Sequence, residues 1–178
     1  MTMMQKIQAK KSKKGFTLVE LVIVIAILAI LAAIAIPVIT TTINSSKLST
    51  MKSDMATTDM LLKEAINTSK ASIYTTTYKG LNFKDNADTI TVQVVLEENN
   101  VTPPSGDWGK YFQRNIGSKT YKMCYYTGND GVKFAVVDTS TNKTTDGTTP
   151  EGTAADLAAG VTIKSMAPEG AGTGGTGN

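Results

Sequence analysis

The chain has 178 residues, of which 41% are hydrophobic and 19% are charged, and its formal net charge is +3. It contains no histidine and a single cysteine, so it lacks the commonest general base and the commonest metal ligand and cannot form an internal disulfide. No serine–lysine or paired-carboxylate arrangement stands out in their place, and we therefore expect no catalytic residues, no metal ion and no other cofactor.

Residues 1–15 form a short basic segment. Its five lysines are not balanced by any acidic residue, which leaves 13 basic against 15 acidic residues from Phe16 onward, a net charge of −2. The positive charge of the chain therefore belongs to this segment, and a nucleic-acid-binding domain loses its main support. Because short lysine-rich segments beside a membrane helix stay in the cytoplasm, we expect the residues after Ile36 to be exported.

Residues 16–36 form one apolar block. Thr17 and Glu20 are the only interruptions in its 21 positions, and about 20 apolar residues suffice for a helix to cross a bilayer. The block therefore predicts a transmembrane helix. A carboxylate inside such a helix is costly and usually has a partner, so we expect Glu20 to be functional; the alternative is a carboxylate that reaches the membrane interface from the start of the helix.

Residues 37–69 continue the helical pattern in an amphipathic form. Proline inside a helix removes one backbone hydrogen bond, so we expect Pro37 to bend or open one continuous helix, which we favour over a fresh helix that starts after residues 40–42. Beyond Pro37, apolar and small residues recur every three or four positions with charged residues between them, which predicts a stripe that faces a partner surface. The stripe consists of Leu48, Met51, Met55, Thr58, Leu62, Ala65 and Ser69.

Residues 70–138 predict a small globular domain. A polar loop with a short strand at residues 73–78 comes first, followed by residues 89–98, whose β-branched content permits a strand but which we interpret as a short helix. Two apolar and aromatic runs, residues 121–127 and 132–138, then flank the sequence Gly-Asn-Asp-Gly. Two such runs around this turn predict a β-hairpin.

Residues 139–178 are rich in threonine and glycine. A segment of this composition buries too little apolar surface to offset its ordering entropy, so we expect a flexible tail, with one edge strand possible at residues 160–166. The predicted fold class is α+β. A long N-terminal helix, membrane-spanning in its first half and amphipathic in its second, packs on a small antiparallel sheet that contains the hairpin.

The segment Lys13–Leu21 reads Lys-Lys-Gly-Phe-Thr-Leu-Val-Glu-Leu and is followed by the apolar helix. It closely resembles the class III leader and N-terminal segment shared by type IV pilins and pseudopilins. The direct resemblance covers about residues 10–45. A weaker one lies at Asp107-Trp108-Gly109, which is similar to a turn of many pseudopilins and Gram-positive pilins but lacks its proline.

The resemblance implies roles for four residues. A prepilin peptidase would cut between Gly15 and Phe16 and methylate the new Phe16 amine. Glu20 would pair with the Phe16 amine of a neighbouring subunit and set the register of assembly, and Pro37 would let the helix lose its regular form as subunits pack. Gly15 suits a protease subsite because it has no side chain and lets the backbone unwind.

The function implied is that of a structural subunit of an extracellular type IV pilus that supports adhesion or motility. Its partners would be copies of itself in a helical homopolymer, the prepilin peptidase, the pilus assembly platform and membrane lipid before assembly. The precursor would sit in the inner membrane with its N-terminus inside, and the mature subunit in a pilus on the bacterial cell surface.

Three alternatives remain at this stage. The first is a pseudopilin of a type II secretion or DNA-uptake system, and only the DNA-uptake case would involve nucleic acid. The second is an exported protein cut by signal peptidase after Ala35, where Ala33-Ile34-Ala35 fits the cleavage pattern, although Glu20 counts against it. The third is an enzyme anchored by one membrane span, which the absence of a nucleophile with a base disfavours.

Overall fold

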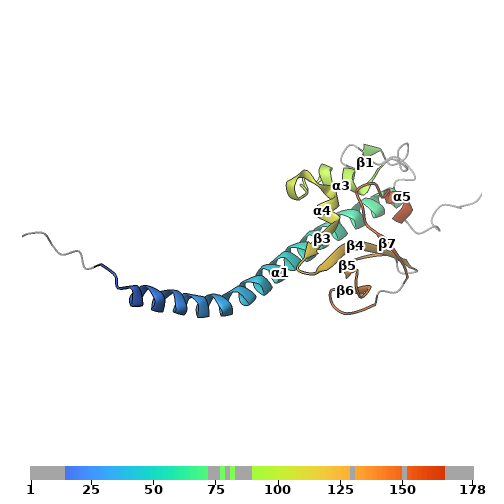
Figure 1. Ribbon diagram of the computed structural model, residues 1–178. Helices are drawn as coiled ribbons and strands as arrows, with labels where there is room; N and C mark the ends of the chain where they lie inside the picture. Colours follow the sequence, from blue (N-terminus) through green and yellow to red (C-terminus); the bar gives the residue numbers. More distant parts are fainter. Residues whose placement is uncertain are drawn as a thin grey trace, which may run out of the picture. The chain divides into compact units, whose positions relative to one another are not determined.

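The computed structural model describes residues 15–71, 77–78, 81–82, 90–128, 131–149 and 152–166. The chain divides into two units, residues 1–42 and residues 43–178, and helix α1 contributes to both. In chain order (Figure 1) the elements are α1 (Leu18–Ala71), β1 (Thr77–Tyr78), β2 (Leu81–Asn82), α3 (Val92–Glu98), η2 (Pro104–Gly106), α4 (Trp108–Phe112), β3 (Gln113–Ile116), β4 (Lys119–Gly128), β5 (Gly131–Asp138), β6 (Lys143–Thr144), β7 (Thr153–Asp156) and α5 (Ile163–Met166).

Helix α1 is uninterrupted over its 54 residues. Pro37 lies inside it, so the prediction of one helix that continues through Pro37 is confirmed, and the alternative of a second helix that starts after residues 40–42 is wrong. The threonine that follows within one turn bonds back to the helix, since the Thr40 hydroxyl donates to the Ile36 carbonyl at 2.9 Å. The Thr40 hydroxyl therefore has its hydrogen-bond partner within the same helix.

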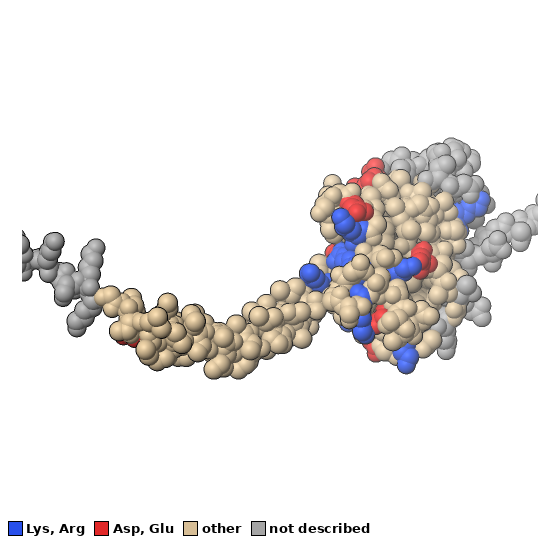
Figure 2. All heavy atoms as spheres, in the orientation of Figure 1, with Lys and Arg blue, Asp and Glu red and all other residues tan. Residues whose placement is uncertain are grey.

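The described part of the first unit, residues 15–42, presents an apolar surface. Its large hydrophobic side chains are exposed by 49% at Val22 to 91% at Phe16. Glu20 is the only ionisable side chain between Phe16 and Ser46, and in Figure 2 this stretch of helix is almost entirely uncharged. By length and composition α1 can cross a membrane. An apolar surface of this extent requires lipid or protein to cover it.

The second unit has its own hydrophobic core. The part of α1 that belongs to this unit supplies the predicted stripe to that core, and the stripe is confirmed: Met51, Met55, Thr58, Leu62 and Ala65 are buried, and Leu48 packs against them partly buried. Buried residues of α3, α4, β4, β5 and α5, together with Ile90 and Leu157, complete the cluster. Figure 1 shows this part of α1 between α3 and α4 on one side and the strands β4 to β6 on the other.

The main sheet is organised around β4. On one edge β4 pairs over its length with β5, with Tyr125 opposite Phe134, so the predicted hairpin is confirmed; residues 129–130 of its turn lie outside the described residues. The other edge of β4 is shared end to end, because β3 pairs with residues 119–122 and β7 with residues 124–127. All these pairings are antiparallel, and β6 extends the sheet from β5.

Helix α3 confirms the helical interpretation of residues 89–98 from residue 92 onward. The side chain of Thr91 caps it by accepting a hydrogen bond from the Val94 N–H. Asp107 caps α4 in the same way, because its carboxylate accepts the N–H groups of Gly109 and Lys110 at 2.9 and 3.3 Å. The Lys110 N–H, as the largest cause, lowers the pKa of Asp107. The Asp-Trp-Gly sequence therefore works here as a helix start.

The C-terminal segment differs from the predicted flexible tail over residues 153–166. Strand β7 joins the sheet at residues 153–156, whereas residues 163–166, expected in an edge strand, form the short helix α5. The side chains of Leu157, Ile163 and Met166 are buried in the core. These few apolar residues are spread among alanines and glycines, so the average composition hides them. Residues 167–178 of the predicted tail lie outside the described residues.

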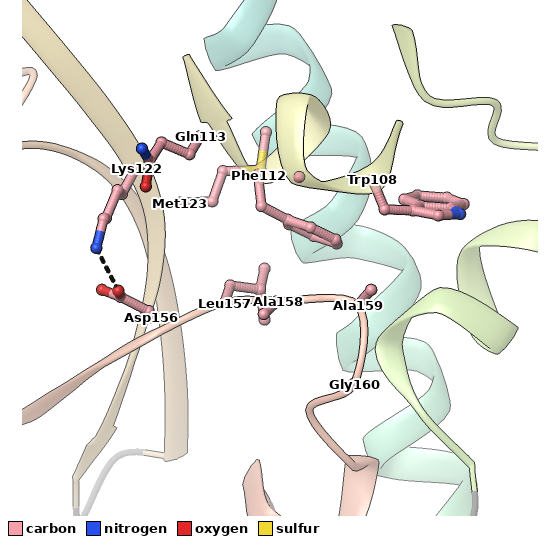
Figure 3. Close-up of a pocket in the computed structure, with 11 residues that line it drawn as sticks. Trp108, Phe112, Gln113, Lys122, Met123, Asp156, Leu157, Ala158, Ala159 and Gly160 are labelled. Atoms are coloured by element: carbon pink, nitrogen blue, oxygen red, sulfur yellow. Dashed lines mark hydrogen bonds and ion pairs between the residues drawn. The ribbon is translucent and has the colours of Figure 1, made fainter. Parts of the chain in front are cut away.

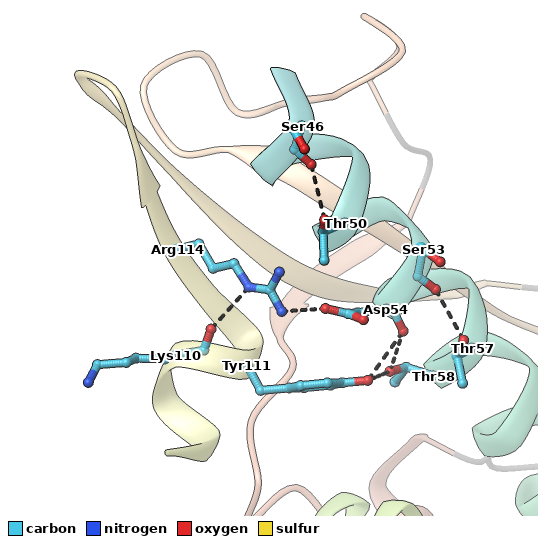
Figure 4. Close-up of polar contacts among 9 residues, drawn as sticks. All are labelled: Ser46, Thr50, Ser53, Asp54, Thr57, Thr58, Lys110, Tyr111 and Arg114. Carbon is cyan, nitrogen blue, oxygen red and sulfur yellow. Dashed lines mark hydrogen bonds and ion pairs between the residues drawn. The ribbon is translucent and has the colours of Figure 1, made fainter. Parts of the chain in front are cut away.

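Polar side chains join α1 to α4 and β3 (Figure 4). The hydroxyls of Thr58 and Tyr111 share a hydrogen bond of 2.9 Å in the core, and burial raises the pKa of Tyr111. Beside them, Arg114 forms an ion pair with Asp54 and donates to the Lys110 carbonyl at 3.2 Å. Both hydroxyls of the buried pair have a hydrogen-bond partner, so this contact fixes the position of α4 on α1.

Asp138 predicts a specific loss of stability in acid. The residue is 6% exposed, and its carboxylate accepts hydrogen bonds from Lys119 at 2.7 Å and from the Ser140 hydroxyl and N–H at 2.6 and 2.9 Å. These contacts, that of Lys119 first, lower the pKa of Asp138 from 3.8 to about 2. The stabilisation is therefore complete above pH 3.8 and is lost as the pH falls towards 2.

We accordingly expect Asp138→Asn to lower the urea concentration at the midpoint of unfolding at pH 7. Between pH 4 and pH 2 this midpoint should fall less steeply in the variant than in the wild type. Lys52→Gln, an exposed change on α1, serves as the control and should leave the fall of the midpoint below pH 4 unchanged. If the midpoint fell equally steeply below pH 4 in the wild type and in Asp138→Asn, the contacts of Asp138 would not stabilise the fold.

The division into two units predicts that a fragment without residues 1–40 folds alone as a monomer. The fragment keeps the stripe of α1 together with the α-helices and strands that cover it. The helical part of the removed segment, residues 18–40, exposes its large apolar side chains, whereas the core of the second unit is built from residues that the fragment keeps. Circular dichroism and sedimentation should show a folded monomer with a cooperative melt. Aggregation or an unfolded spectrum would mean that the second unit depends on the apolar helix.

Candidate processing and assembly site

The peptide bond between Gly15 and Phe16 lies ahead of the first helical residue. Residues 15–17 are not helical, and the Phe16 side chain is among the most exposed of the large hydrophobic residues. A Cβ atom placed on Gly15 would meet no described atom within 4 Å. Since a protease needs an exposed chain that can extend across its active site, this bond has the local structure of a cleavage site.

Thr17 and Glu20 form a reciprocal pair at the start of α1. The Thr17 N–H and hydroxyl both donate to Glu20 Oε2, at 2.9 and 2.8 Å, and the Glu20 N–H donates back to Thr17 Oγ1 at 3.2 Å. This is a capping box, in which two otherwise unpaired backbone N–H groups at a helix start are satisfied. The positive end of the helix dipole favours a carboxylate at this position.

The capping box gives Glu20 a partner that differs from the one the sequence suggested. The expected partner was the Phe16 amine, but in the uncut chain the Phe16 nitrogen belongs to the peptide bond with Gly15. Among the residues that the structure describes, Thr17 is the one that bonds the Glu20 carboxylate. The pattern Thr-x-x-Glu ahead of an apolar run was visible in the sequence and was missed.

Gly15 and Phe16 therefore lie directly before α1 and Glu20 lies in its first turn, whereas Pro37 is far along the helix. It is 17 residues beyond Glu20 in the same helix, about 25 Å at 1.5 Å per residue. The structure thus brings the processing residues and the carboxylate into one site and leaves Pro37 as a separate feature of the helix. The assembly roles of Glu20 and Pro37 remain predictions.

The other reactive groups of the described chain offer little chemistry. Cys124 is buried, and that burial raises the pKa of its thiol to about 11, so it stays protonated near neutral pH and packs as a small apolar side chain. Within the described ranges, no group of three or more metal-ligating side chains comes together. Among the described residues, the start of α1 is therefore the candidate functional site, because an exposed peptide bond and a carboxylate occur there together.

Residues 10–36 match the family described as the prokaryotic N-terminal methylation motif. The chain matches no curated protein and no solved structure. These residues thus carry the class III leader of type IV pilins and pseudopilins, and they support a pilin-like or pseudopilin precursor. Together, the leader motif and the apolar helix fit a membrane-anchored precursor.

Proposed function

We propose that the chain is a structural subunit of an extracellular type IV pilus. A prepilin peptidase cuts it between Gly15 and Phe16 and methylates the Phe16 amine, and the mature subunits then assemble through their N-terminal helices. The observation that carries the proposal is the combination of the matched methylation motif with an exposed bond before α1 and an uncovered apolar helix after it. Proteins with this leader serve as structural components, and we assign the chain no enzymatic activity.

The exposed apolar surface supports assembly by self-association. In the precursor, lipid covers residues 16–36; when a subunit leaves the bilayer, only other apolar helices can take the place of lipid. Copies that associate through two different surfaces, with a rotation that does not close a ring, build an open helical filament. The mature chain can therefore form a homopolymer with its apolar helices inside and its second unit facing the solvent.

The charge of Glu20 supports a role for this residue in that assembly. Cleavage creates a positive amine at Phe16, close in sequence to the Glu20 carboxylate, and both groups would be buried once helices pack. Opposite charges buried together avoid the cost of an isolated buried charge. We propose that the Phe16 amine of a neighbouring subunit takes the carboxylate and thereby sets the register between subunits.

The proposed partners follow from these steps: the peptidase that cuts the leader, the assembly platform that extracts the mature subunit, and membrane lipid before extraction. The precursor lies in the inner membrane with its N-terminus inside, and the filament lies outside the bacterial cell, where it supports adhesion or motility. A long exposed tail would favour a pilus over a pseudopilus, but residues 157–166 contribute to the core of the second unit, so filament abundance has to decide between the two.

The test is to shear filaments from cells that express the chain at its native level and to measure the mass of the subunit. We expect abundant long filaments whose subunit begins at N-methylated Phe16. Filaments that appear only on overproduction would point to a pseudopilus. A mature chain that begins at Ile36, or a full-length chain in assembled filaments, would contradict the proposal.

A further inference from the structure

A pocket of about 440 Å³ opens on the second unit beside α1, α4 and β3, and we refer to it as the basic pocket. Three cations line it: Lys47 of α1, Lys110 of α4 and Arg114 of β3. No acidic side chain is among the lining residues that the structure describes; the remaining ones are Pro104, Gln113, Asn115 and Ile116. Cations from three different elements thus converge on one hollow.

The three cations differ in how firmly they are held. Arg114 is fixed by its ion pair with Asp54 and its bond to the Lys110 carbonyl (Figure 4), and some of its five N–H donors remain for a ligand. Lys110 pairs with Asp107 at 3.4 Å, but both side chains are well exposed, and such a pair is weak. Lys47 is exposed and has no ion pair among the described residues. Three cations therefore face two carboxylate partners, which leaves a net charge of +1.

Lys47 places the basic pocket at the end of the apolar part of α1. The run of exposed large apolar side chains that begins at Phe16 ends with Ile43. Lys47 follows four residues later, so it lies on the same face of α1, about 6 Å along the helix axis. The turn between β3 and β4 lies at this level too, because a Cβ atom on Gly117 would approach Asn44 Nδ2 to 2.9 Å. Whatever the orientation of the second unit, the connection through α1 keeps this pocket beside the apolar segment.

We propose that the basic pocket binds the phosphodiester group of an anionic phospholipid in the membrane that holds the precursor. The headgroup layer is about 5–7 Å thick on each side of the hydrocarbon core, which matches the step from Ile43 to Lys47. Phosphate oxygens accept strong hydrogen bonds from ammonium and guanidinium groups. The single negative charge of the phosphodiester balances the net charge of the cluster, whereas a zwitterionic lipid would bring a further cation.

The other pocket beside α4 does not compete for this ligand. It lies between α4 and residues 157–160 (Figure 3), and its cation, Lys122, pairs with Asp156 at 2.5 Å. Phe112 and Met123, which line it, are almost fully buried and offer little surface. Of these two pockets, the basic pocket is the one with charge available to a phosphate.

The binding test uses the uncut full chain, labelled with ¹⁵N and held as single copies in lipid nanodiscs. The discs contain phosphatidylcholine alone or phosphatidylcholine with an equal part of phosphatidylglycerol. A trace of phosphatidylcholine with a nitroxide on its headgroup broadens the NMR signals of nearby amides. We expect stronger broadening at residues 110–116 in the phosphatidylglycerol discs, with residues 163–166 of α5 as the reference. In 1 M salt, where the Debye length is about 3 Å, the difference between the discs should disappear.

Matched variants locate the contact. Lys47→Gln and Lys110→Gln remove two exposed cations, and together they should lower the ratio of lipid-bound to free second units by about fivefold for each lysine removed. Lys143→Gln makes the same change of charge on β6, at the opposite end of the sheet from β3, and should leave the ratio unchanged. Arg114 is left intact, because its removal would deprive Asp54 of its partner.

Three results would overturn the proposal while the other amide signals stay native. The first is equal broadening in the two kinds of disc. The second is an effect of phosphatidylglycerol that the double lysine variant retains, which would place the contact elsewhere. The third is an equal loss with Lys143→Gln, which would make the effect a response to overall charge. The inference rests on the membrane insertion that the proposed function also requires, but each of these results leaves the test on sheared filaments unaffected.

Discussion

Glu20→Val should insert into the membrane and be cut at Gly15 as usual, yet it should form no filaments. The change makes the span more apolar and leaves the cleavage site intact, so insertion and cleavage should proceed as in the wild type. Once subunits pack, however, each Phe16 amine would be buried without a counter-charge. Breaking a buried ion pair in this way typically costs about 3–5 kcal/mol, which is enough to stop a repeated addition of subunits.

The capping box requires a control, because Glu20→Val also removes the hydrogen bonds of Glu20 with Thr17. Glu20→Gln is the matched variant, since glutamine can close a capping box but carries no charge. If the charge matters, Glu20→Gln should fail like Glu20→Val. Glu20→Asp, which keeps the charge but shortens the side chain by one methylene, should assemble at an intermediate level.

The quantities to compare are the yield of sheared filaments and the membrane pool of mature subunit. A full membrane pool with no filaments is the expected result for Glu20→Val. Normal filaments from Glu20→Val would make the carboxylate a tolerated residue near the membrane interface. Normal filaments from Glu20→Gln alone would assign Glu20 to capping the helix rather than to assembly.

Gly15→Trp should leave the chain in the membrane as uncut precursor. Gly15 has open space around it and no positive φ, so the tryptophan does not disturb the described structure, and any defect arises in the peptidase. A side chain in a subsite adapted to glycine displaces the bond to be cut, and a displacement of about 1 Å can slow a reaction by about 10²-fold.

Gly15→Ala, with a single added methyl group, is the control and should be cut at a rate between those of wild type and Gly15→Trp. The measurement is the ratio of precursor to mature chain in membranes, followed by the mass of the N-terminus. If Gly15→Trp were processed at the normal rate and still began at Phe16, the peptidase would not read the residue before the bond.

The long helix and the hairpin could be predicted from the sequence because each has a strong local pattern. Twenty-one nearly unbroken apolar positions and a stripe with three- and four-residue spacing predict two helical stretches, and the structure joins them through Pro37 into one helix from Leu18 to Ala71. The short elements carried no such pattern. Strand β3 has four residues, Gln113–Ile116, three of them polar, and it is a strand because β4 lies beside it. Only tertiary pairing defines it.

The candidate site was predictable to the same degree. Gly15, Phe16 and Glu20 follow from the leader motif, and the Thr17 partner of Glu20 could have been read from the four-residue spacing of the capping box. The shared edge of β4 could not be predicted, because two strands, β3 and β7, meet it from distant parts of the chain.

The closure of the core by its last segment governs when the second unit can fold. The Val92 N–H donates to the Val161 carbonyl at 2.8 Å, the Ile163 N–H donates to the Ile90 carbonyl at 2.9 Å, and Met166 is fully buried. These contacts join residues far apart in the chain, and such contacts form late. Under the proposed export, the second unit therefore stays open until residue 166 has crossed the membrane, while residues 16–36 are already held in the bilayer. A chain cut short before Val161 would lack these contacts and expose its core to proteases, so under the proposed function incomplete subunits are expected to be degraded before they assemble.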